Sequence, residues 1–334
     1  MQLEGLHHVT AVSGRIQQNL TFYTGVLGLR LVKKSVNQDD VSAYHLFYAD
    51  RVGSPGTDMT FFDWPHIDPN QPGTDSIRGT AFRVSGSDSL SFWEDRLREQ
   101  GVENIRRAAL GETELLSFLD PEGLRLYLVD DHGAPFAGEL WPRPDIPDQH
   151  LLRGFYAVVL STPDFHQLQS ILTTGLQFTL VEERKWIDGQ TPLQRYHTQP
   201  EGGPGSEVWV LEEPGKAPAQ LGAGGVHHVA FRVKNQQEQT AWRNHLGKLG
   251  IHATRVIDRF WFKSIYFRVT RGILIEIATD GPGFDVDEDQ KKLGEKLALP
   301  PFLEPRREEI EADLKPLSPE DKPHDSHSPE PAPV

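Results

Sequence analysis

Apolar residues along this chain alternate between the spacing of strands and the spacing of helices, in an order that repeats. Four short apolar segments have the composition of strands: HHVTAV, TAFRV, FYAVVLS and HHVAFRV. Each is followed by a stretch with apolar residues three or four positions apart, as at Leu90, Trp93 and Leu97, and this spacing predicts a helix. Further strand-like segments come next, and the last of them follows a turn, as in PEGLRLYLV and RGILIEIAT. The repeating unit is therefore a strand, a helix and three strands.

Glycines mark the end of each predicted helix at nearly constant intervals. They are Gly28, Gly101, Gly175 and Gly250, so that successive intervals are 73, 74 and 75 residues. We expect each to be the residue just after its helix, where glycine adopts a left-handed backbone without strain. Residues 87–88 and 162–164 are expected to begin the second and third helices as N-caps. Matching intervals with the same element order indicate four copies of one βαβββ module.

These modules predict an α+β fold in which four βαβββ units pair into two cup-shaped, half-open barrels, since one module cannot bury the concave face of its sheet alone. Along the chain, 1–132 holds modules one and two, and 153–280 holds modules three and four, the half richer in metal ligands. A linker dense in Pro and Gly, 133–152, separates the halves. A partly helical extension, 281–314, is expected to pack on the body, and the polar, Pro-rich tail 315–334 to be disordered.

Composition narrows the classes of function. A formal net charge of −14 argues against a nucleic-acid partner, and no apolar run approaches the roughly 20 residues of a membrane span. No signal-peptide pattern precedes the first strand and cysteine is absent, as expected for a cytoplasmic protein. Without thiolates, a metal would have to bind to His, Asp or Glu. The sequence is compatible with a homo-oligomer.

The phrase His-His-Val occurs at the start of the first and the fourth module. In an alignment of the modules, the second His of the phrase occupies a position that holds His8, Gly79, Tyr156 and His228 in the four copies. Four residues beyond the turn glycine, the last strands carry Thr60, Tyr127, Trp209 and Glu276. These eight positions contain three residues typical of metal sites: His8, His228 and Glu276. For them to meet, modules one and four must share a barrel, which leaves modules two and three to form a metal-free one.

Glu276 lies in the apolar segment LIEIA, where strand alternation places it on the opposite face from Ile275 and Ile277. A carboxylate in a core strand is costly unless a partner compensates its charge, and a cation would do so. Two His and one carboxylate are the facial set expected for non-haem Fe(II), with positions left open for substrate and O2; Mn(II) would suit the same ligands. Ordinary polar histidines near strand ends would not account for two copies in register.

In these modules and ligands the sequence resembles the vicinal oxygen chelate superfamily of glyoxalases, bleomycin-resistance proteins and extradiol dioxygenases. The similarity is strongest to the ring-cleaving dioxygenases that act on hydroquinones, and it spans residues 3–313. The phrases that carry it are LHHVT, YHLFYADRVGSPGTDMTFF, IRGTAF, LLRGFYAVVLS, GVHHVAF and IEIATDGPGFDVDED. The resemblance implies an oxidoreductase of aromatic compound degradation, an Fe(II)-dependent enzyme that uses O2 to cleave a hydroquinone-type or catechol-type ring.

The resemblance also assigns residues. It makes His8, His228 and Glu276 the iron ligands, and it places near the active site Arg259, Tyr266, His7, Thr10 and His227. Tyr266 could donate a proton to a substrate oxygen or a ring intermediate, and Arg259 could stabilise an anionic oxygen or a product carboxylate. Thr10 shares a strand face with His8, whereas alternation points His7 and His227 to the opposite face.

Two other functions on the same fold stay open at this point. A glyoxalase-like lyase or isomerase would usually take a fourth ligand from the position that holds Thr60, a poor metal ligand. A metal-free binding or drug-resistance protein would leave Glu276 uncompensated. The other histidines lack the register of the two pairs and are expected at the surface or in local polar contacts: His45, His66, His132, His150, His166, His197, His245, His252, His324 and His327.

Overall fold

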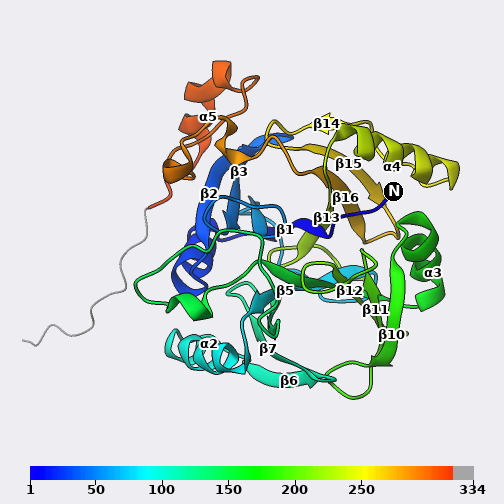
Figure 1. Cartoon of the computed structure of the whole chain (residues 1–334). Helices are drawn as coiled ribbons and strands as arrows, with labels where there is room; N and C mark the ends of the chain where they lie inside the picture. The colour runs from blue at the N-terminus through cyan, green and yellow to red at the C-terminus, as the bar shows by residue number, and fades with distance from the viewer. Residues whose placement is uncertain (319–334) are drawn as a thin grey trace, which may run out of the picture.

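The computed structural model describes residues 1–318, in which 16 strands form two eight-stranded curled sheets. The two sheets occupy the upper and the lower half of Figure 1, and helices α2, α3 and α4 lie on the outside of the molecule. The predicted fold class is confirmed. The predicted disordered tail, 315–334, lies outside the described residues from 319 onward.

Each of the four modules has the predicted order of elements. Module one consists of β1 (Leu6–Ser13), α1 (Ile16–Leu20), β2 (Arg30–Asn37), β3 (Asp40–Ala49) and β4 (Asp58–Asp63). Module two consists of β5 (Ser76–Val84), α2 (Ser87–Glu99), β6 (Arg106–Leu110), β7 (Thr113–Leu119) and β8 (Arg125–Asp130). Module three consists of β9 (Phe155–Thr162), α3 (Phe165–Ser170), β10 (Thr179–Lys185), β11 (Pro192–His197) and β12 (Glu207–Glu212). Module four consists of β13 (Val226–Val233), α4 (Gln236–Lys248), β14 (Ile257–Asp258), β15 (Lys263–Arg268) and β16 (Leu274–Thr279).

The sheets pair the modules as the shared ligand set predicts. One sheet has the order β14-β15-β16-β13-β1-β4-β3-β2 and so joins modules one and four; the other, β10-β11-β12-β9-β5-β8-β7-β6, joins modules two and three. In both, the first strands of the two modules pair antiparallel at the centre, β1 with β13 and β5 with β9. We call these units the 1/4 barrel and the 2/3 barrel. Each takes one module from either half of the chain, so each sheet crosses the linker 133–152.

Two of the predicted helix ends are wrong. Gly28, Gly101 and Gly250 have the expected positive φ, but Gly175 does not, because a π-helical turn (Ile171–Gly175) extends α3 to that residue. The left-handed position there is Gln177, with φ of 59°. A similar π-helical turn (Thr21–Val26) follows α1. At the other end, Asp164 caps α3 as predicted, whereas α2 begins at Ser87 itself with Gly86 as its N-cap.

The two cups differ in what fills them. Ile275 and Ile277 belong to the main core, on the opposite face of β16 from Glu276, as alternation predicted. The 2/3 barrel holds a separate apolar cluster that includes Tyr127, Tyr156, Trp186 and Trp209. The 1/4 barrel holds a smaller one that includes Phe47, Ala230, Trp261, Phe262 and Phe284. In the 2/3 barrel, Tyr127 and Trp209 thus place aromatic rings at the positions where the 1/4 barrel carries Glu276 and Thr60.

The extension 281–314 packs on the 1/4 barrel. Its elements are three short 3-10 turns (Phe284–Val286, Gln290–Lys292 and Glu304–Arg306) and α5 (Arg307–Asp313). Lys33 of β2 is fully buried, and its ammonium donates to the Phe284 carbonyl at 2.9 Å and to Asp287 at 2.8 Å, with Glu288 as a further partner. Leu293 and Leu299 are buried, but Phe302 is exposed. This buried charge cluster ties the extension to the barrel that contains Glu276.

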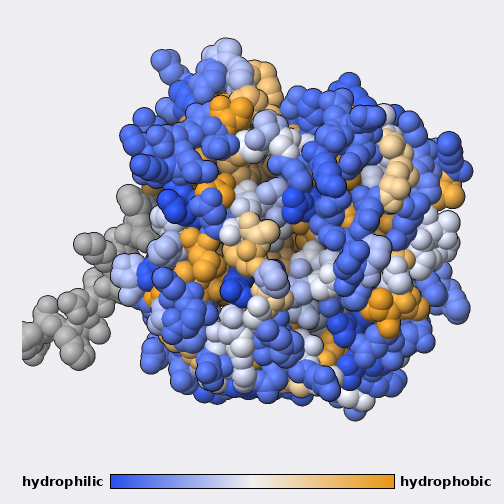
Figure 2. Space-filling model, in the orientation of Figure 1, coloured by the Kyte–Doolittle hydropathy of each residue, from blue (hydrophilic) through white to orange (hydrophobic). Residues whose placement is uncertain are grey.

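Among residues 1–318, the large apolar side chains that are exposed are Met1, Val181, Leu221, Leu249, Val286 and Phe302. The face in Figure 2 is largely hydrophilic, with hydrophobic residues in small separate groups. Across residues 1–318, no helix has both the length and the apolar character needed to cross a membrane.

Candidate metal centre

His8, His228 and Glu276 meet inside the 1/4 barrel, as predicted. All three are buried, and their ligand atoms lie within 4.8 Å of one another. Three neighbouring strands supply them: β1 and β13 pair at the barrel centre, and β16 runs parallel to β13. The two His-His phrases recur because each module contributes one imidazole to a single site at their junction.

The three ligand atoms form a small triangle. The distance from His8 Nε2 to His228 Nε2 is 3.2 Å, and these nitrogens lie 3.2 Å and 3.0 Å from Glu276 Oε2. For metal–ligand bonds of about 2.1 Å, two ligands at a right angle are about 3.0 Å apart. The triangle therefore fits three ligands on one face of an octahedral ion, which is the facial arrangement of two His and one carboxylate.

Each ligand histidine is oriented by the histidine before it. His7 Nδ1 lies 2.9 Å from His8 Nδ1, and His227 Nδ1 lies 2.8 Å from His228 Nδ1. His7 Nε2 faces the carbonyl of Thr279 at 3.2 Å, so this nitrogen carries the proton and Nδ1 of His7 must accept. His8 then donates from Nδ1 and keeps the lone pair of Nε2 free. Alternation pointed His7 to the opposite face, but its ring reaches its neighbour and fixes the tautomer that metal binding requires.

The accepting histidines are held neutral. The pKa of His7 is lowered to about 3, first by burial and then by the neighbouring His8. Burial and His228 likewise lower the pKa of His227 to about 3. Because a protonated imidazole cannot accept a hydrogen bond, the low pKa of His7 keeps it able to accept from His8 at neutral pH.

The charge of Glu276 also points to a cation. Its side chain is fully buried, and among the described residues its two oxygens accept no hydrogen bond of good geometry. Burial alone would raise the pKa of Glu276, but in the absence of a metal the positive charge shared with His8 and His228 holds it well below its ordinary value. An ionised carboxylate without hydrogen bonds in an apolar strand is costly, and a bound divalent cation would supply the missing partner.

Tyr266 and Arg259 lie beside these ligands. Tyr266 on β15 is directly opposite Glu276 on β16, and its ring meets the His228 ring edge to face at 5.6 Å. The Arg259 guanidinium lies 5.6 Å from the centre of the Tyr266 ring and donates to Asp39 at 2.9 Å. Burial and nearby Glu276 raise the pKa of Tyr266, so its hydroxyl stays protonated at neutral pH. The site thus has a proton donor and a fixed positive charge next to the ligand set.

Thr10 lies opposite His228 in the pairing of β1 with β13, and its hydroxyl begins a chain of hydrogen bonds. Its Oγ1 lies 2.8 Å from Thr60 Oγ1, which lies 2.9 Å from His45 Nε2. His45 lines the same cavity as His8 and His228, so the expectation that it makes only surface or local contacts is wrong. The signal for it in the sequence was its place on the second strand after the first predicted helix, between the first His-His-Val phrase and Thr60. Burial lowers its pKa well below the ordinary value, so this imidazole is neutral.

The cavity over the ligands is narrow and aromatic. Its volume is about 30 Å³, and besides the polar groups it is lined by Phe47, Phe62, Trp261 and Phe262. A cavity of about 150 Å³ is needed to hold a benzene ring. The lining side chains must therefore move apart before a ring can enter.

One position in the alignment of modules is corrected by the strand register. In module one, His8 pairs with the residue two positions beyond the turn glycine, Asp58. In module three, the residue two positions beyond the turn glycine is Glu207, and it pairs with Ala157 rather than with Tyr156. Tyr156 thus occupies the position equivalent to His7. The conclusion that modules two and three lack metal ligands is unaffected, since alanine cannot bind a metal.

Comparisons with known proteins agree with this geometry. A family model described as "Glyoxalase/Bleomycin resistance protein/Dioxygenase superfamily" matches residues 5–128. The "Putative ring-cleaving dioxygenase MhqA" of Bacillus subtilis is 42% identical over 317 residues, which cover 95% of this chain and 100% of the relative. This chain belongs to that superfamily. Within it, the "Chlorohydroquinone/hydroquinone 1,2-dioxygenase" of Sphingobium indicum is 30% identical and covers 92% of this chain and 95% of the relative.

Solved structures of the superfamily show the same fold. A crystal structure described as a "putative dioxygenase" from Bacillus subtilis has 35% identity and a TM-score of 0.86, covering 95% of this chain and 98% of the other. Glyoxalase I from Zea mays has 15% identity and a TM-score of 0.59, and the match covers 83% of this chain and 92% of the other. In this member of the superfamily, the position from which a fourth ligand could come holds Thr60, whose hydroxyl contacts Thr10 and His45. Among residues 1–318, the cluster around Glu276 contains three metal-ligating side chains.

Proposed function

We propose that this protein is an Fe(II)-dependent dioxygenase that cleaves the ring of a hydroquinone-type aromatic with O2. The observation that carries the proposal is the set of His8, His228 and Glu276 with a threonine at the fourth position, because three ligands on one face leave room for substrate and O2 together. A relative that acts on hydroquinones, at 30% identity over most of the chain, supports the substrate class. The alternative substrate is a catechol-type ring, and the alternative metal is Mn(II).

When bound by these three residues, Fe(II) would supply a net positive charge that favours a phenolate ligand, and a place for O2 beside it. The remaining tasks fall to side chains of this chain. The neutral Tyr266 can hydrogen-bond a substrate oxygen or return a proton to the ring carbon skeleton. Burial lowers the pKa of Arg259, but its hydrogen bond and charge interaction with Asp39 raise it, so Arg259 stays charged and can stabilise the carboxylate that ring opening creates.

The aromatic lining positions the substrate and excludes water. Phe262 packs against the His8 ring at 5.1 Å, and Phe62 lies 6.5 Å from the His228 ring, so a planar ring that binds between them is held over the ligand set. Gln38 donates to the carbonyl of Arg259 at 2.9 Å and so joins the tip of the β2–β3 hairpin to the segment before β15. These two segments border the narrow cavity, and their separation would admit the substrate.

The experiment that tests the proposal is O2 uptake by full-length protein reconstituted anaerobically with Fe(II). Methylhydroquinone and catechol are compared, Mn(II) replaces Fe(II) in a parallel series, and Glu276→Ala is the control. Uptake with methylhydroquinone that Glu276→Ala abolishes supports the proposal. Uptake with catechol alone would leave the iron site in place and refute the hydroquinone assignment. Absence of uptake with either substrate, from protein shown to hold iron, would refute the dioxygenase assignment.

A further inference from the structure

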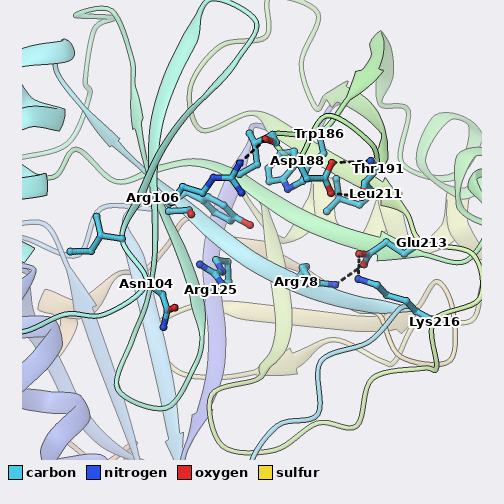
Figure 3. Close-up of a pocket in the computed structure, with 14 residues that line it drawn as sticks. Arg78, Asn104, Arg106, Arg125, Trp186, Asp188, Thr191, Leu211, Glu213 and Lys216 are labelled. Carbon is cyan, nitrogen blue, oxygen red and sulfur yellow. Dashed lines mark hydrogen bonds and ion pairs between the residues drawn. The ribbon is translucent and has the colours of Figure 1, made fainter.

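The 2/3 barrel has an open cavity of its own, drawn in Figure 3. Its volume is about 590 Å³, within the usual range of small-molecule sites. It includes Tyr127, which occupies on β8 the position that Glu276 occupies on β16. The concave face that carries the metal ligands in the 1/4 barrel therefore carries aromatic rings in the 2/3 barrel. None of the residues that line this cavity belongs to the metal centre.

The floor of this cavity is built from packed aromatic rings. The Tyr127 and Trp186 rings meet edge to face at 5.7 Å, and Trp186 meets Trp209 in the same way at 5.7 Å behind them. Ile105, Ile187 and Leu211 extend the apolar surface. The Tyr127 side chain is almost completely buried, yet its hydroxyl makes no hydrogen bond to any described residue. Such a floor suits the face of a planar ring and offers it one polar contact.

Positive charge surrounds this floor. Arg78, Arg106, Arg125 and Lys216 line the cavity together with only two acids, Asp188 and Glu213. Arg78 donates to Glu213 at 2.6 Å, and Lys216 pairs with the same carboxylate at 2.5 Å. Asp188 is occupied by its own turn, where it accepts from Thr191 Oγ1 at 2.6 Å and from two backbone amides. Both acids of the cavity are thus already paired.

Two guanidinium groups are left over. Among residues 1–318, Arg125 makes no hydrogen bond or ion pair, and Arg106 donates only to the carbonyl of Ile187 at 3.5 Å. In Figure 3, Arg78 points toward Glu213 and Lys216, Arg106 extends toward Trp186 and Asp188, and Arg125 lies between these two parts of the lining. Neither guanidinium has an ion pair within hydrogen-bond distance among the described residues, although Arg106 lies in the electrostatic reach of Asp188, and the planar fork of each matches a carboxylate.

We propose that the cavity of the 2/3 barrel is a second ligand site, which binds a small aromatic carboxylate. The ring lies on Tyr127 and Trp186, and the carboxylate is held by Arg125 and Arg106. A cation is excluded by the surplus of arginine, and a purely apolar ligand would leave both guanidinium groups without a partner. The site is independent of the metal centre, so its existence does not depend on the proposed dioxygenase activity.

The test is isothermal titration of the full-length, metal-free protein with benzoate, with benzyl alcohol and inorganic phosphate as comparison probes. For a ligand of this size we expect a dissociation constant on the order of 0.1–1 mM for benzoate. Benzyl alcohol lacks the charge and phosphate lacks the ring, so both should bind at least about tenfold more weakly. Equal binding of benzyl alcohol or of phosphate, or no detectable binding of benzoate, would overturn the proposal.

Variants locate the bound probe. Arg125→Met and Arg106→Met should each weaken benzoate binding at least about tenfold; Arg106 is exposed, so its replacement leaves the fold intact even where that of half-buried Arg125 does not. Arg98→Met, at an exposed arginine of α2 paired with Glu94, is the matched control and should bind benzoate as the wild type does. Glu276→Ala should also bind it normally. Loss of binding in Glu276→Ala, or wild-type binding in both Arg106→Met and Arg125→Met, would refute a site in the 2/3 barrel.

Discussion

The most informative single substitution is Glu276→Gln, because it keeps the shape of a fully buried side chain and removes only its charge. At a metal concentration of about 1,000 times the dissociation constant, binding stabilises the folded wild type by about 4.1 kcal/mol. Residues that merely orient a ligand already contribute about 10- to 100-fold to metal affinity, so loss of the carboxylate ligand should cost at least about 100-fold. At the same metal concentration, binding would then stabilise the folded variant by about 1.4 kcal/mol.

The difference of about 2.7 kcal/mol is measurable as a melting temperature. With an unfolding entropy of about 2.1 cal/mol/K per residue over the described chain, it corresponds to about 4 °C. The assay is anaerobic calorimetry with and without Fe(II), in which the increment caused by metal is compared, so that any effect of the substitution on packing cancels. Glu207→Gln is the control, since Glu207 is an equally buried carboxylate that pairs with Arg195 in the 2/3 barrel. An increment in Glu276→Gln equal to that of the wild type would refute the ligand assignment.

The remaining predictions concern the neighbours of the ligand set. His7→Phe removes the acceptor of the His8 Nδ1 proton and should weaken Fe(II) binding about 10- to 100-fold in an anaerobic titration, whereas the exposed control His132→Phe should not; equal affinities would contradict the orienting role. In metal-free protein the folded pKa of His7 is about 3 against an ordinary value of 6.5, so the unfolded chain binds more protons and stability falls as the pH drops from 6.5 toward 3. Between about pH 5.5 and 4.5, the free energy of unfolding in urea should therefore fall less steeply with falling pH in His7→Phe than in the wild type, by about 1.4 kcal/mol per pH unit. The same slope in both proteins would show that His7 is not held neutral. Tyr266→Phe should lower kcat for O2 uptake at least about tenfold while the iron content stays at the wild-type level, and an unchanged kcat would remove Tyr266 from proton transfer.

The repeat and the ligands could be predicted from the sequence because they depend on the register of the modules, and the His-His-Val phrase marks that register in two of them. His8 and His228 stand at the same point of two copies of one phrase, and Glu276 interrupts an apolar strand, so their convergence required only that modules one and four pair. The error at Tyr156 shows the limit of this reasoning. A slip of one residue moves a side chain to the other face of a strand, and the apolar segment FYAVVLS contains nothing that fixes its register.

Other features depend on contacts between distant segments, which local patterns do not contain. His45 has no repeat partner, and its role follows from the pairing of β3 with β4, which brings it to Thr60. The contact between His7 and His8 depends on side-chain rotation, and alternation along the strand says nothing about it. The arginine group of the 2/3 barrel comes from β5, β6 and β8, and no local motif marks it.

We propose that a metal held by His8, His228 and Glu276 directs both atoms of O2 into an aromatic ring. The most direct test is mass spectrometry of the product formed from methylhydroquinone by the Fe(II)-loaded protein under isotopically labelled O2. We expect the wild type to form a ring-opened acid with one labelled oxygen in its carboxylate and a second in the new carbonyl when that carbonyl is reduced as it forms, and we expect no product from Glu276→Ala. A carboxylate without label, an intact ring, or the same labelled product from Glu276→Ala would contradict this assignment.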